Sequence, residues 1–209
     1  MKNKKFYLVL GMHRSGTSLV ANLLHNHGID MGQGHWKPGP NEDNPNGYFE
    51  DYRFRAINDD LLKASKYHVK DWEYRIPHIA TPNKKINKRM NTLKSIIAKK
   101  ERPCGAKDPR FCLTWRRWRF DPEITQVVFV YRDVEAVINS MIKREPDKFS
   151  REHWQYVWTS YNAKGASISQ LYDTITVSYE QILDEKGIKA LGIHDSSGII
   201  DERLNRSGK

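Results

Sequence analysis

The chain has few cysteines and no long apolar run, and both absences limit what it can be. Among its 209 residues the cysteines are Cys104 and Cys112, too few for a disulfide framework or a four-ligand zinc site. Both lie in apolar surroundings, so we expect small core residues in a reducing compartment. The apolar run Phe6–Gly11 is too short for a signal peptide or a membrane span. The sequence therefore predicts a cytoplasmic protein.

Acidic residues are also in deficit. The chain carries 35 Lys and Arg against 25 Asp and Glu, a net charge of +10, which favours an anionic partner. Nucleic acid, a sugar polyanion, a membrane surface and a nucleotide all fit this charge. A hydrophobic content of 38% with 11% aromatics indicates a globular chain. Without linkers or repeats, we expect residues 1–209 to fold as a single domain.

Apolar runs alternate with helical periodicities along the chain. The runs predict strands, and the periodicities predict helices between them. The expected strands are 6–10, 103–106, 124–131 and 174–177, and the expected helices are 19–28, 51–66, 84–101, 113–118, 134–142 and 154–171. This alternation predicts an α/β fold, with a central, mostly parallel sheet flanked by helices in a three-layer sandwich like that of P-loop NTPases.

The segment Gly11–Ser18 joins the first expected strand to the first expected helix. The first turn of a helix offers unpaired N–H groups and the positive end of the helix dipole, both favourable to phosphate. Glycine permits close backbone approach, and the hydroxyls and a guanidinium add donors. The residues expected to bind phosphate are Arg14, Ser15, Gly16, Thr17 and Ser18. The alternative is a tight turn capped by Ser15 or Thr17.

This loop lacks the lysine of a Walker A motif. In that motif the second glycine is followed by Lys, whereas here Gly16 is followed by Thr17. The lysine would reach the β- and γ-phosphates of a nucleoside triphosphate. Its absence disfavours ordinary ATP or GTP hydrolysis.

The run Arg14-Ser-Gly-Thr-Ser18 resembles the 5′-phosphosulfate loop of sulfotransferases that use 3′-phosphoadenosine 5′-phosphosulfate (PAPS), particularly bacterial and viral members. The resemblance implies that Arg14 approaches the bridging oxygen and that Ser15–Ser18 hold the 5′-phosphate. Arg132 at the end of a strand, followed by Ser140 on a helix, is similar to the family's 3′-phosphate anchor. An alternative pairs Arg132 with Asp133 or Glu135.

Further segments extend the resemblance over about residues 5–185. They are 44–50, 107–110 and 177–180. The chain departs from cytosolic members near its end, where their glycine-rich Arg-Lys-Gly segment has no clear counterpart. Its weak substitutes are Arg203, Arg206 and Lys209.

The resemblance implies transfer of a sulfuryl group from PAPS to a hydroxyl or amine of a carbohydrate or small-molecule acceptor. It implies release of 3′,5′-adenosine bisphosphate and no metal ion. The acceptor itself is not identified, and its pocket is expected in residues 29–50 and 67–83. Adenine is expected to stack on an aromatic ring, for which the candidates are Trp72, Trp115 and Tyr179, with core packing as the alternative for each.

Such a reaction needs a base to deprotonate the acceptor. Many cytosolic relatives have a Lys-Thr-His segment, but here Lys107-Asp108 stands in that place. Glu50 is the first candidate, with a charge near a helix N-terminus as its equal alternative. Asp108 is the second candidate. Lys107 is expected to stabilise the transferring group or to pair with Asp108.

Three other side chains are weaker candidates. His13 and His35 follow Glu50 and Asp108 as possible bases, and His13 is expected rather to shape the loop. Arg110 is expected to contact the acceptor or the donor, or to form a surface ion pair.

Two other functions remain as alternatives. A P-loop kinase would use the strand before Asp133 as a Walker B strand, with Asp133 binding magnesium. A non-enzymatic protein that binds nucleotides or nucleic acid would use the basic helix 84–101, or the arginines near Trp115 and Trp118. Without a recognised nucleic-acid module we expect those charges to form solvated faces.

Overall fold

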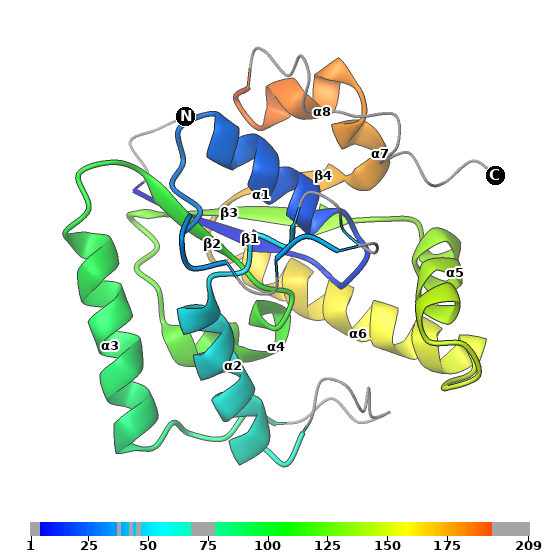
Figure 1. Cartoon of the computed structure of the whole chain (residues 1–209), viewed down its shortest axis with the longest axis horizontal. Helices are drawn as coiled ribbons and strands as arrows, with labels where there is room; N and C mark the ends of the chain where they lie inside the picture. Colours follow the sequence, from blue (N-terminus) through cyan, green and yellow to red (C-terminus); the bar gives the residue numbers. More distant parts are fainter. Residues whose placement is uncertain (1–4, 37–38, 42–43, 45–46, 68–77, 194–209) are drawn as a thin grey trace.

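The computed structural model describes residues 5–36, 39–41, 44, 47–67 and 78–193. Within these residues a central sheet consists of four parallel strands in the spatial order β2-β1-β3-β4 (Figure 1). The strands are β1 (Phe6–Leu10), β2 (Cys104–Lys107), β3 (Thr125–Tyr131) and β4 (Asp173–Ser178). The parallel sheet confirms the predicted α/β class.

The register places the carboxyl ends of the three strands β1, β2 and β3 at one edge. Phe6 lies opposite both Cys104 and Thr125, and Val9 lies opposite Lys107. Because parallel strands end at the same edge, the segments that follow them gather there. The expected phosphate loop and Arg132 follow two of these strand ends, and Lys107 is the last residue of β2, directly before Asp108–Arg110.

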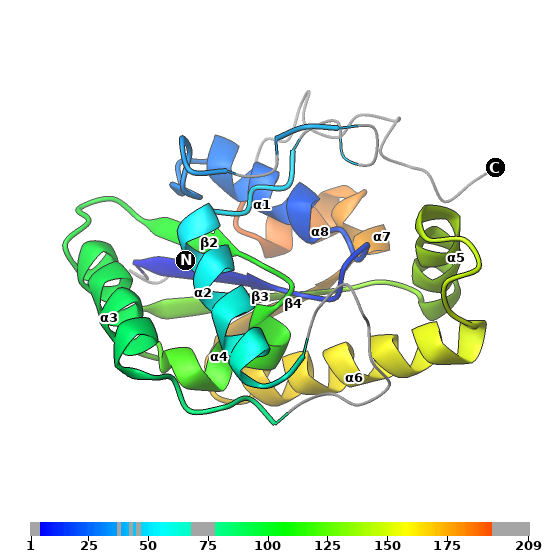
Figure 2. The same ribbon diagram turned by 60° about the horizontal axis from the view of Figure 1, so that its bottom comes forward.

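Helices cover both faces of the sheet because its strands are apolar on both sides. Tyr7 and Val9 face the layer of α1 (Thr17–Asn26), α7 (Tyr179–Ile182) and α8 (Glu185–Ala190). Leu8 and Leu10 face the opposite layer. That layer contains α2 (Tyr52–Ala64), α3 (Lys84–Ala98), α4 (Phe111–Trp118) and α6 (Arg151–Ser169). Figure 2 shows the three layers, which confirm the predicted sandwich.

Helix α5 (Val134–Arg144) follows β3 and stands at the carboxyl edge of the sheet (Figure 1). Its buried face consists of Val137, Ile138 and Met141, which join the cluster on the α6 side. Asp133 caps its first turn by accepting a hydrogen bond from the backbone N–H of Ala136. This packing fixes the helix that carries Ser140.

The sequence patterns miss the two short helices after β4. A capping box between Ser178 and Gln181 starts α7, in which each side chain bonds the other residue's backbone N–H. The helix expected at 113–118 begins earlier, at Phe111, and the helix expected at 84–101 ends earlier, at Ala98. Part of the expected turn near residue 45, and much of 67–83, lie outside the described residues.

Both cysteines are buried and free of disulfides, as expected of core residues. Burial raises the pKa of the Cys104 thiol to about 11 and that of the Cys112 thiol to about 12. Neither is therefore a reactive thiolate at neutral pH. Among the described helices, none combines the length and apolar character needed to cross a membrane.

Candidate active site

The loop between β1 and α1 is a tight turn whose backbone conformation requires glycine. Gly16 forms the N-cap of α1 with φ +88°, and a Cβ atom there would lie 2.4 Å from Cδ2 of Tyr179. Arg14 also has a positive φ, +67°. Positive φ values of this kind are rare for residues other than glycine and often mark functional loops. The loop therefore has little freedom to accept other residues at Gly16.

The hydroxyls of the loop do not cap the helix. Among the described residues no side chain caps α1, and the fully buried Ser15 has no hydrogen-bond partner there for its Oγ atom. The expectation that Ser15 or Thr17 merely caps a turn is therefore wrong. A buried hydroxyl without a partner costs free energy. A phosphate oxygen bound in this loop would accept a hydrogen bond from the Ser15 hydroxyl.

The structure brings the two expected phosphate anchors together. Nε of Arg14 donates a 2.8 Å hydrogen bond to Oγ of Ser140, although the residues are 126 positions apart in the sequence. A guanidinium nitrogen of Arg132 lies 3.3 Å from the backbone carbonyl of Arg14 and donates to it. The Arg132 guanidinium also stacks 4.3 Å above the ring of Tyr179. The loop between β1 and α1, the end of β3 and helix α5 thus form one cationic site.

The alternative partners of Arg132 are engaged elsewhere. Asp133 caps α5, and Glu135 pairs with Arg151. The half-exposed carboxylate of Glu180 lies 3.9 Å from Nε of Arg132. The expectation of an Arg132 pair with Asp133 or Glu135 is therefore wrong. As a helix cap, Asp133 also has a structural role that needs no magnesium.

A second group of charges lies at the end of β2. Oε1 of Glu50 accepts a 3.0 Å hydrogen bond from Nζ of Lys107, and Oε2 lies 3.5 Å from Arg110. Glu50 is 6% exposed. Burial alone would raise its pKa, but the Lys107 and Arg110 charges outweigh this and lower the pKa to about 2. Asp51, rather than Glu50, caps α2, because its side chain accepts from the N–H of Arg53.

Asp108 is fully buried and surrounded by donors. It accepts hydrogen bonds from the Arg110 guanidinium at 2.7 Å, the Arg110 N–H at 2.9 Å and Asn58 at 2.8 Å. Burial raises its pKa, while the Arg110 charge opposes the rise. The expected Lys107–Asp108 pair is wrong, since Lys107 bonds Glu50. Asp108 has the contacts of a structural support.

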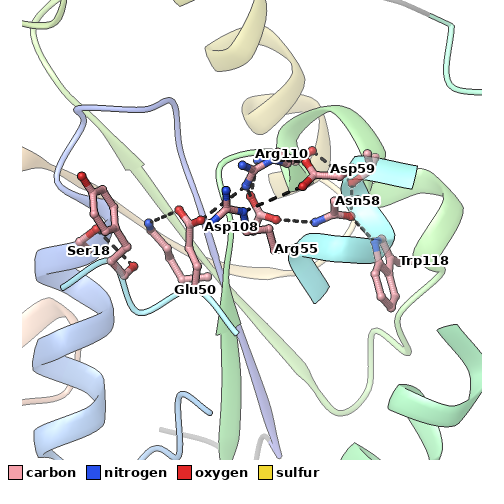
Figure 3. Close-up of polar contacts among 11 residues, drawn as sticks. Ser18, Glu50, Arg55, Asn58, Asp59, Asp108, Arg110 and Trp118 are labelled. Atoms are coloured by element: carbon pink, nitrogen blue, oxygen red, sulfur yellow. Dashed lines mark hydrogen bonds and ion pairs between the residues drawn. The ribbon is translucent and has the colours of Figure 1, made fainter. Parts of the chain in front are cut away.

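Arg110 connects these carboxylates to α2. Its Nε lies 2.8 Å from Asp59, and the arginine itself is 7% exposed. The expectation of a surface ion pair for Arg110 is therefore wrong. The guanidinium lies within a buried network between α2 and the start of α4 (Figure 3).

No sequence motif singles out Asn58 and Asp59. Asn58 is fully buried, donates to Asp108, and accepts from Thr114 at 2.7 Å and the Trp118 indole at 2.8 Å. Figure 3 shows Asn58 between Asp108 and Trp118. It lies on the same buried helix face as Phe54 and Leu61. A polar residue in an apolar stripe of a helix is the signal that could have identified it.

The two histidine candidates lie in different places. His13 belongs to the loop and meets the buried ring of Tyr161 edge to face at 6.0 Å. Burial, and then the charge of Arg110, hold the pKa of His13 well below its usual range, so it is neutral at pH 7. His35 instead packs against Tyr52, 5.7 Å away, at the start of α2.

Of the aromatic candidates for adenine, Tyr179 lies at the site. Trp115 is buried in the core, where its ring meets Tyr172 edge to face at 4.4 Å. Trp72 and the C-terminal Arg203, Arg206 and Lys209 lie outside the described residues.

Several basic residues considered for nucleic-acid binding have structural partners. Trp115 and Trp118 are buried, so their rings cannot stack on bases. Arg89 pairs with Asp60, and Lys100 pairs with Asp30. Part of the positive charge therefore stabilises the fold.

The chain shares its fold with known protein structures. No family model matches the chain, and no curated protein matches it. The chain is similar to the sulfotransferase STF1 from Mycobacterium tuberculosis H37Rv, with 15% identity and a TM-score of 0.49. The alignment covers 98% of this chain and 72% of that one. A similarity at this level assigns neither a family nor an activity to the chain.

Proposed function

We propose that this chain transfers a sulfuryl group from PAPS to a hydroxyl or amine of a carbohydrate or small-molecule acceptor. The observation that carries the proposal is the hydrogen bond between Arg14 and Ser140. It joins a loop that resembles the 5′-phosphosulfate site to a strand end and helix that resemble the 3′-phosphate site. Two adjacent cationic anchors suit a nucleotide with two separate phosphate groups, such as PAPS.

The phosphate-loop residues have contacts that fit this donor. The Ser15 hydroxyl is buried and finds no hydrogen-bond partner in the part of the chain that the structure describes, and the Gly16 backbone leaves no room for a side chain. With the first turn of α1, these groups would hold the 5′-phosphate. Thr17 and Ser18 begin that turn, and Ser18 also donates to the Tyr48 carbonyl at 3.4 Å.

Sulfuryl transfer would follow an in-line displacement. The acceptor oxygen or nitrogen bonds to sulfur as the bond from sulfur to the 5′-phosphate oxygen breaks. The electron pair of that bond leaves with 3′,5′-adenosine bisphosphate, and the acceptor proton passes to a base. Charge builds on the leaving oxygen, where a cation such as Arg14 or Lys107 stabilises it.

Glu50 is the base that we propose. The carboxylate of Asp108 accepts hydrogen bonds from Asn58 and Arg110. The carboxylate of Glu50 instead accepts a hydrogen bond from Lys107, whose side chain is flexible. Paired as it is, Glu50 is a weak base, because its pKa is about 2. Movement of Lys107 toward the anionic donor would remove that cation and strengthen the base. Asp108 is then a supporting residue.

The proposal predicts selective binding of the bisphosphate. We expect calorimetry to show tighter binding of 3′,5′-adenosine bisphosphate than of 5′-AMP or ATP–magnesium. Arg132→Ala should weaken bisphosphate binding by about 10- to 100-fold, because a charged hydrogen bond is lost. The same substitution should change 5′-AMP binding little.

Arg116→Ala provides the matched control. It removes one positive charge from an exposed position on α4, outside both anchors. We expect it to leave the bisphosphate affinity within about twofold, since isolated surface charges contribute little. Equal binding of bisphosphate and 5′-AMP would exclude the sulfotransferase proposal. A preference for ATP–magnesium would also exclude it and would favour a kinase.

A further inference from the structure

Glu50 has a separate cation at each carboxylate oxygen. Lys107 donates to Oε1 at 3.0 Å, and the Arg110 guanidinium faces Oε2 at 3.5 Å. The carboxylate is almost completely buried. A buried carboxylate that loses all its neighbouring cations either takes up a proton or, if it stays ionised, destabilises the folded chain.

The two cations differ in how firmly they are held. Arg110 is fixed by Asp108 at 2.7 Å and by Asp59 at 2.8 Å, and Asn58 in turn holds Asp108 at 2.8 Å. These contacts come from α2 and from the turn before α4, so the guanidinium cannot follow an anion without breaking them. Lys107 reaches Glu50 through a flexible four-carbon chain.

We propose that Arg110 is a positioning residue, which keeps the Glu50 carboxylate charged and in place when Lys107 turns to the donor. This inference rests on the proposed function, because it takes Glu50 as the base and PAPS as the anion that attracts Lys107. Asn58 and Asp59 on α2 then act through Arg110. The row of side chains from Glu50 through Arg110 to Asp59 is visible in Figure 3.

The groups facing Glu50 determine its protonation. Besides Lys107 and Arg110, these are the neutral His13 of the loop and the carboxylate of Asp108. With Arg110 present, Glu50 stays ionised after Lys107 leaves. Without Arg110, the Glu50 carboxylate would lie next to the negative charge of Asp108 with no cation beside it. It would then take up a proton when the nucleotide binds.

The test is the number of protons taken up when 3′,5′-adenosine bisphosphate binds. Calorimetric titrations at about pH 7 in two buffers of different ionisation enthalpy give this number. We expect Arg110→Gln to take up about one proton more than the wild-type chain and to bind the bisphosphate about tenfold more weakly. Arg110→Lys, which keeps the charge, should restore most of both values.

The double variant Glu50→Gln/Arg110→Gln identifies the proton acceptor. We expect it to lose the extra uptake, whereas an uptake by His13 would persist. Persistent uptake in the double variant, or unchanged uptake in Arg110→Gln, would overturn the inference. If Arg110→Gln does not fold, Asp59→Asn loosens Arg110 at the half-exposed end of the network; partial extra uptake supports the inference and none overturns it.

The two proposals fail in different ways. If the wild-type chain does not prefer the bisphosphate to 5′-AMP, the proposed function is wrong. If it does prefer the bisphosphate and Arg110→Gln shows no extra proton uptake, only the role of Arg110 is wrong.

Discussion

Gly16 and Gly28 have the same backbone conformation in different surroundings. Both have φ +88°, a value that favours glycine. At Gly16 a Cβ atom would meet the Tyr179 ring at 2.4 Å, whereas at Gly28 it would meet nothing within 4 Å. The pair therefore separates backbone strain from steric conflict in the loop between β1 and α1.

We predict that Gly16→Ala is clearly more destabilising than Gly28→Ala. Strain alone should cost Gly28→Ala about 1 kcal/mol of unfolding free energy. Gly16→Ala should cost roughly 2–4 kcal/mol, because Tyr179 or the loop must also move. Denaturant unfolding measures both values. Equal losses would show that the Tyr179 contact relaxes without cost.

At the level of single residues, the sequence predicted which motif residues lie close together better than it predicted their neighbours. Arg14, Arg132 and Ser140 were recognised from local motifs, and the structure brings them together. Glu50 and Lys107 were expected at the site separately, but their direct pairing was not. Asn58 was missed because its role depends on Asp108, which is 50 positions away in the sequence. Local patterns carry no information on such a partner.

At the level of elements, α5 distinguishes two readings of Asp133. The kinase alternative needs this carboxylate as a magnesium ligand, whereas the structure uses it to cap α5. Asparagine caps helices about as well as aspartate, but it is a much weaker magnesium ligand.

We therefore predict that Asp133→Asn leaves stability and bisphosphate binding nearly unchanged. Asp133→Ala should lose about 1 kcal/mol of unfolding free energy, because the cap is removed. Thermal unfolding and calorimetric titration measure the two effects. If the wild-type chain binds ATP in a magnesium-dependent way and Asp133→Asn abolishes that binding, the kinase hypothesis would be favoured instead.

The elements themselves were largely predictable. Apolar runs predicted β1 and β3 most clearly, because strands buried on both faces are continuously apolar, whereas β4 is exposed over much of its length. The helix before β4 and the helix carrying Ser140 followed from their periodicity. The helices α7 and α8 are only 4 and 6 residues long, too short for a periodic pattern to be recognised.

At the level of the whole molecule, the buried pair of Glu50 and Lys107 makes stability depend on pH. Despite burial, neighbouring cations lower the pKa of folded Glu50 from 4.5 to about 2. A lowered pKa means that the folded state prefers the ionised carboxylate. The contribution is present above about pH 4.5 and is lost as the pH falls toward 2.

We predict that the stability difference between the wild-type chain and Glu50→Gln narrows on acidification. At neutral pH the wild-type chain should be more stable by roughly 2–4 kcal/mol, because the variant leaves Lys107 and Arg110 without this carboxylate. Urea unfolding from pH 7 down to about pH 3 measures the difference. The exposed control Glu101→Gln should show no comparable narrowing, and a constant difference for Glu50→Gln would contradict the prediction.

The strand order β2-β1-β3-β4 has a consequence for access to the site. From β1 the chain crosses to β2 on one side, and from β3 it crosses to β4 on the other. The connections that leave the carboxyl ends of β1 and β3 therefore run in opposite directions, the arrangement at which open α/β sheets commonly bind ligands. Arg14 and Arg132 follow these two strands. Under the proposed function, a nucleotide would therefore enter from the sheet edge without the central strands separating, and differences between acceptors would reside in the surrounding loops while the sheet stays the same.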